Sequence, residues 1–244
     1  MGKRNFLVRA PYRPPYLRQL GADYALGTLT LLLFGFGATW ALHIAPPDRM
    51  MGDVYRILFV HVPSAWLSLV AYTVTVLASA LFLWRGQLFW DAVAEASAEL
   101  GVLFNVLLLV TGSIWGKPTW GVWWTWDPRL TTAAIMCFAF LGYLALRALV
   151  ADVGRRATWS AVAAVLIYAD IPLVWFSVRW WNTLHQLQSS PETMAEPMVV
   201  ALRLNAFAFL ALYLWMMRHR VPLASLRHRR QLEEPPMPAA RERS

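Results

Sequence analysis

The fold class follows from the run Val102-Leu103-Phe104-Asn105-Val106-Leu107-Leu108-Leu109-Val110, which is apolar at every position except Asn105. Only helices and closed β-barrels can cross a bilayer, because only they satisfy every backbone polar group internally. A barrel strand would alternate polar and apolar residues, and this run does not alternate. The run therefore predicts a membrane-spanning helix.

Blocks of this kind fill most of the 244-residue chain, 58% of which is hydrophobic. Soluble domains usually contain roughly 45–50% hydrophobic residues, and a helix needs about 20 apolar residues to span a bilayer. The blocks cover residues 24–45, 57–84, 93–115, 128–150, 157–178 and 197–217. We therefore predict an all-α integral membrane protein with six transmembrane helices. The helical domain, residues 24–217, is flanked by an N-terminal segment, 1–23, and a basic, disordered tail, 218–244.

Basic residues predict the orientation in the membrane. Sixteen Lys and Arg residues flank the side that holds both termini, and five flank the other side. Because basic residues favour the cytoplasmic side, both termini are predicted to be cytoplasmic. This topology accounts for the net charge of +8, so we expect no nucleic-acid partner. Cys137 is the single cysteine, which excludes a disulfide framework, a CxxC pair and a cysteine metal site within one chain.

The outer loop between the third and fourth spans is unusually rich in tryptophan. Its members are Trp115, Trp120, Trp123, Trp124 and Trp126. Helical spacing places Trp120, Trp123 and Trp124 on one face, which predicts a short amphipathic element. Two uses remain open: an aromatic belt at the membrane interface, or a surface for a planar ligand. Asp127-Pro128 is a typical helix start, with Asp127 as N-cap.

Three histidines, His43, His61 and His185, fall on the same outer side, whereas His219 and His228 lie in the basic tail and are expected to be solvated. Each outer histidine could be an ordinary interfacial residue. Together with the tryptophans and the outer cations they also match the needs of haem: axial nitrogens, aromatic walls and partners for propionates. Four of the five outer cations are candidate propionate partners: Arg56, Lys117, Arg129 and Arg179. Zinc would normally require three or four protein ligands, so haem fits these residues better than zinc does.

Two sets of motifs resemble a known family. Trp115-Gly116-Lys117-Pro118 and Trp120 through Thr131 resemble the WWD signature of haem-handling membrane proteins. The segments 55–63, containing His61, and 176–186, containing His185, resemble the two histidine motifs of the CcmC haem exporters of cytochrome c maturation. The resemblance covers all six spans in order and length, and His43 belongs to neither motif.

The resemblance implies a haem-handling protein without enzymatic activity in the bacterial inner membrane. It implies that His61 and His185 are axial ligands of haem b on the periplasmic side. The implied haem-binding surface comprises Trp115, Trp120, Trp123, Trp124, Trp126 and Asp127, with Arg56, Lys117, Arg129 or Arg179 as propionate partners. The implied partners are the ABC-type subunits CcmA and CcmB, which would supply ATPase activity, the small CcmD, the haem chaperone CcmE, and membrane lipid.

Two other functions remain alternatives. A transmembrane b-type cytochrome would need histidine pairs at two depths, whereas His61 and His185 share one side. A small-molecule permease would use Asp170, a costly intramembrane carboxyl. Asp170 can also be explained structurally, as a buried carboxyl beside a kink at Pro172.

Overall fold

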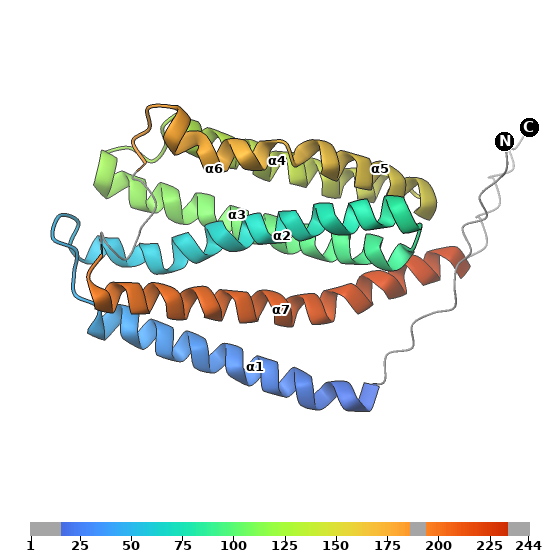
Figure 1. Cartoon of the computed structure of the whole chain (residues 1–244), viewed down its shortest axis with the longest axis horizontal. Helices are drawn as coiled ribbons and strands as arrows, with labels where there is room; N and C mark the ends of the chain where they lie inside the picture. The colour runs from blue at the N-terminus through green and yellow to red at the C-terminus, as the bar shows by residue number, and fades with distance from the viewer. Residues whose placement is uncertain (1–15, 186–193, 234–244) are drawn as a thin grey trace, which may run out of the picture.

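Helices make up most of the part of the chain that the structure describes (Figure 1). The computed structural model describes residues 16–185 and 194–233. In chain order the elements are α1 (Tyr16–Thr39), the π-helical turn η1 (Trp40–Ile44), the 3-10 turn η2 (Asp53–Ile57), α2 (Leu58–Arg85), α3 (Leu88–Trp120), α4 (Pro128–Leu149), α5 (Val153–Ile167), α6 (Asp170–Trp180) and α7 (Glu196–Glu233). These residues contain no β-strand and form six segments long and apolar enough to cross a membrane. The six-helix prediction is therefore confirmed.

The hairpin of α2 and α3 lies at the centre of the bundle (Figure 1). Gly86 closes this hairpin with a left-handed backbone, φ 68°, a conformation that glycine adopts without steric cost. On one face α7 packs against both helices and carries α1 on its far side. On the other face lie α4, α5 and α6. The bundle therefore has layers on both sides of the α2–α3 hairpin.

The fifth span is broken in the middle. It ends as α5 at Ile167 and restarts as α6 at Asp170. Pro172 has no backbone N–H to donate into the preceding turn, which fits a restart just before it. The Oδ2 atom of Asp170 is buried and has no hydrogen-bond partner among the described residues. The break makes α6 a short, separate helix that leads directly towards His185.

The structure corrects the predicted boundaries at both ends of the chain. The first helix begins at Tyr16, inside the predicted N-terminal segment, and α7 continues to Glu233. Residues 218–233 are therefore helical and are not part of a disordered tail. Ion pairs tie this extension to the bundle, because Arg218 pairs with Asp23 and Arg220 with Glu99. The rest of both predicted segments, 1–15 and 234–244, lies outside the described residues.

A buried ionic cluster joins three helices at the end of the bundle where α3 begins. Arg147 of α4 donates to both carboxylate oxygens of Asp91, at 2.7 and 2.8 Å, and to Glu95 at 2.8 Å. His228 of α7 places Nε2 2.8 Å from the same Glu95 oxygen. His228 is 3% exposed, so the prediction that it is solvated is wrong. His219 is exposed, as expected.

Candidate functional site

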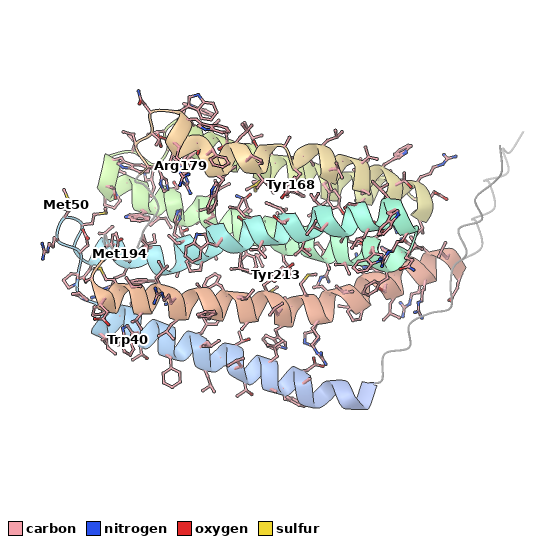
Figure 2. The ribbon with its side chains drawn as sticks, viewed as in Figure 1. Trp40, Met50, Tyr168, Arg179, Met194 and Tyr213 are labelled. Atoms are coloured by element: carbon pink, nitrogen blue, oxygen red, sulfur yellow. The ribbon has the colours of Figure 1, made fainter. Side chains whose placement is uncertain are left out.

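A cavity of about 280 Å³ lies at the opposite end of the bundle, which we call the histidine end. Helices α2, α3, α4 and α6 and the two loops that carry Trp124 and His185 form its walls. Figure 2 shows the side chains at this end, where Met50 and Arg179 are labelled. The lining is mostly apolar and aromatic, with His61, His185 and Arg129 among its few polar groups.

The two predicted histidines face each other at this cavity. Their ring centroids are 6.5 Å apart and their ring planes differ by 27°. A metal–imidazole bond measures about 2 Å, so two rings that bind one metal from opposite sides should have centres about 6 Å apart. The observed centroid spacing is compatible with two imidazoles that bind one metal ion.

His61 is held firmly within the bundle. Its side chain belongs to α2 and is 7% exposed. The edge of Trp115 packs against the imidazole, with centroids 5.6 Å apart and planes at 77°. A Cβ atom at Gly112 would lie only 3.0 Å from His61 Cε1, so glycine at that position leaves room for the ring. Helices α2 and α3 together fix where this imidazole lies.

The tryptophans divide into two groups. Trp115, Trp120 and Trp124 line the cavity, and the rings of Trp120 and His185 are 6.4 Å apart. Trp123 and Trp126 face outwards, 58% and 83% exposed. The predicted separate amphipathic element is not present. Instead, α3 continues to Trp120 and ends at Gly121 with φ 80°, and residues 121–127 form an irregular loop.

Only one of the four predicted cations lines the cavity. Arg129 does, and its Nη1 atom is buried without a hydrogen-bond partner among the described residues. Arg56 donates to the carbonyls of Ala41 and Ala45, and therefore caps η1.

The two other cations have different surroundings. Lys117 Nζ donates to the carbonyl of Gly121 at 2.9 Å. Arg179 is exposed and does not line the cavity. Arg129 is therefore the best-placed partner for an anionic group inside the cavity.

Asp127 does more than cap α4. One carboxylate oxygen accepts from the backbone N–H of Arg129 at 2.9 Å, as the N-cap prediction requires. The other oxygen accepts from Thr183 Oγ1 at 2.5 Å and from the N–H of Leu184 at 2.8 Å. Thr183 Oγ1 in turn accepts from the N–H of His185 at 3.0 Å. Asp127 therefore ties the loop that carries His185 to the start of α4.

These hydrogen bonds also set the charge of Asp127. Partial burial acts to raise the pKa of Asp127, but hydrogen bonds from Thr183, Leu184 and Arg129 outweigh burial and hold this pKa below its usual value. The stabilisation from a carboxylate with a lowered pKa is present above its unfolded-state pKa and is lost as the pH falls through the folded-state pKa. The Asp127 clamp should therefore be intact at neutral pH.

Replacing Asp127 with serine is expected to release this loop while keeping the helix cap. Serine is a good N-cap residue, but its side chain is too short to reach Thr183. Hydrogen–deuterium exchange of the segment containing Leu184 and His185 should accelerate in Asp127→Ser. Asp152→Ser is the matched control, because Asp152 caps α5 through Arg155; exchange of the loop should not change there. Unchanged loop exchange in Asp127→Ser would show that the clamp does not hold the loop.

Several cavity residues were not predicted from the sequence. Trp66 and Trp175 both line the cavity and were not among the predicted site residues. Neighbouring helices contribute them, so no spacing within one segment reveals them. Thr111 contacts His61. As a polar residue in an apolar span, Thr111 gave only a weak sequence indication of a role near the site. His43 is exposed in η1 and does not line the cavity, and Gln186 of the second histidine motif lies outside the described residues.

Comparison with known proteins places this chain in a family. The family model described as "Heme exporter protein C" matches residues 16–234. The chain is similar to proteins of that name from Haemophilus influenzae (41% identity over 202 residues, 80% of this chain and 82% of the relative) and Bradyrhizobium diazoefficiens (37% over 193 residues, 77% and 73%). It is also similar to the Escherichia coli K12 protein of that name (34% over 223 residues, 89% and 91%). The chain therefore belongs to the heme exporter protein C (CcmC) family.

Proposed function

We propose that this protein binds haem at the histidine end and passes it on during the maturation of c-type cytochromes. The observation that carries the proposal is the pair of imidazoles, His61 and His185, which face each other at 6.5 Å beside an aromatic cavity. Membership of the CcmC family supports haem as the cargo. The two imidazoles would bind the iron of haem b from opposite sides.

The cavity walls suit the rest of a haem molecule. Trp115, Trp120 and Trp124 offer flat aromatic surfaces for the macrocycle. Arg129 supplies a buried cation with an unused donor for a propionate. We propose that Arg56 and Lys117 act indirectly, by fixing the backbone around η1 and the end of α3.

Transfer of haem requires a site that can release it. We propose that haem leaves towards the periplasm and is received by the chaperone CcmE. We further propose that CcmA and CcmB drive the release and that CcmD assists. Trp123 and Trp126 lie exposed near the cavity and would offer an aromatic surface to the acceptor. The side chains in this account bind, orient and release the cargo, so no covalent catalysis is assigned to this chain.

Both alternative functions have less support. A b-type cytochrome would need a second histidine pair at the far end, but the described histidines there, His219 and His228, are both on α7, and His228 is bonded to Glu95. A permease that uses Asp170 would place that residue on its pathway. The cavity reaches Val174 and Met136, and Asp170 is not one of its lining residues.

The direct test is the haem content of detergent-purified protein expressed in haem-replete cells. We expect haem to co-purify with the wild type and to be lost from the double variant His61→Ala/His185→Ala. The matched control is His43→Ala/His219→Ala, which removes two exposed imidazoles and should retain wild-type haem. Helical content, measured by circular dichroism, should be the same in all three proteins. Wild-type haem content in the His61/His185 variant would overturn the proposal.

A further inference from the structure

A buried hydrogen bond joins His61 to a neighbouring helix. His61 Nδ1 lies 3.1 Å from Oγ1 of Thr111, which belongs to α3. The His61 and Thr111 residues are 7% and 9% exposed, so water does not compete freely for this contact. A buried hydrogen bond of this kind can fix which ring nitrogen carries the proton.

The other contacts of Thr111 decide the direction of this hydrogen bond. A threonine hydroxyl has one proton to donate and lone pairs to accept with. Thr111 Oγ1 lies 2.7 Å from the carbonyl of Leu107 and 3.2 Å from that of Leu108, and carbonyls can only accept. The hydroxyl proton is therefore directed into α3, and an oxygen lone pair remains for His61. The arrangement that satisfies both groups has the Nδ1–H of His61 donating to Thr111.

A neutral imidazole with its proton on Nδ1 has its free lone pair on Nε2. We infer that Thr111 is a positioning residue for haem binding, which holds His61 in the Nδ1–H tautomer so that Nε2 is ready to bind iron. This inference rests on the proposed function. Trp115 and Gly112 pack against the same ring. They hinder a flip of the imidazole about its Cβ–Cγ bond, which would move Nδ1 away from Thr111.

Loss of the hydroxyl should weaken haem binding without removing any iron ligand. Hydrogen-bond partners of metal-bound histidines fix ring orientation and raise ligand basicity, and their loss typically costs about 10–100-fold in metal affinity. In Thr111→Val we therefore expect haem affinity to fall about 10–100-fold. A more basic ligand favours oxidised iron, so the midpoint potential should move to a more positive value in Thr111→Val. Thr111→Ser keeps the hydroxyl and should behave as the wild type.

The experiment is a haemin titration of the full-length, detergent-purified protein, followed by its absorption spectrum and midpoint potential. Thr73→Val is the matched control, because among the described residues the hydroxyl of Thr73 on α2 bonds only to the carbonyl of Leu69. The inference is overturned if Thr111→Val matches the wild type, or if Thr111→Ser fails as Thr111→Val does. If His61→Ala also binds haem as the wild type does, the proposed function itself fails, which is a separate result.

A second measurement does not depend on haem or on any change at Thr111. In wild-type protein labelled with ¹⁵N-histidine, nitrogen chemical shifts report the tautomer of each ring, and the signals of His61 are assigned as those lost in His61→Ala. We expect the Nδ1–H tautomer for His61. The Nε2–H tautomer would overturn the inference.

Discussion

Replacing His61 with glycine is expected to lower haem affinity by at least about 100-fold, because loss of a hydrogen-bond partner alone typically costs 10–100-fold. The substitution opens a space the size of an imidazole, bounded by Trp115 and Thr111. Free imidazole should enter this space and restore the spectrum of a six-coordinate, low-spin haem. Haem titration with and without millimolar imidazole measures both effects.

His43→Gly is the control for this experiment, because His43 is exposed and does not line the cavity. Its haem affinity should equal that of the wild type, with or without imidazole. Wild-type affinity in His61→Gly would show that the iron is bound elsewhere. His185→Gly is the positive control for rescue by free imidazole. If imidazole restores haem binding in His185→Gly but not in His61→Gly, His61 has a structural role and is not an iron ligand.

Replacing Arg147 with methionine is expected to destabilise the protein by about 3–5 kcal/mol, the usual cost of breaking a buried ion pair by removing one partner. Arg147 is 6% exposed and is bonded to both Asp91 and Glu95. Without Arg147, Asp91 keeps only His228 among the cluster residues, at 3.6 Å, whereas Glu95 keeps both His228, at 2.8 Å, and Arg227, at 3.2 Å. Thermal unfolding in detergent, followed by circular dichroism, measures the loss of stability.

Two further variants make this stability prediction specific. Arg155→Met removes an exposed arginine from the same end of the bundle and should leave the unfolding temperature unchanged. Arg147→Met/Asp91→Leu/Glu95→Leu/His228→Leu replaces all four buried members of the cluster with apolar side chains and should recover most of the stability, because such exchanges are often neutral. An unchanged unfolding temperature in Arg147→Met would show that the cluster does not stabilise the bundle.

The transmembrane architecture could be predicted from the sequence because each span is determined locally. A continuous apolar run such as Val102–Val110 must be helical in a bilayer, and all six predicted spans are confirmed. A kink at Pro172 was one of the two interpretations of Asp170, but the two-residue interruption between α5 and α6, at Tyr168 and Ala169, was not predicted, since a proline can either kink or interrupt a helix. Its position depends on packing against neighbouring helices.

The candidate site was only partly predictable. His61, His185 and Arg129 meet at one cavity, as the shared outer side suggested. Helical spacing grouped Trp123 wrongly with Trp120, because the left-handed turn at Gly121 ends α3 between them.

Residues that act across helices left no periodic signal in the sequence. The clamp from Asp127 to Thr183 and the buried cluster around Arg147 join segments that are more than 50 residues apart. Such contacts depend on how the helices pack, which the spacing within one segment does not determine.

The central claim is that two histidines from different segments bind one haem. The electron paramagnetic resonance spectrum of the ferric, haem-loaded protein tests this claim most directly. We expect a low-spin signal typical of two imidazole ligands in the wild type, and we expect its loss in both His61→Gly and His185→Gly. A high-spin wild-type signal, or a low-spin signal that survives both substitutions, would show that these two histidines do not bind the iron together.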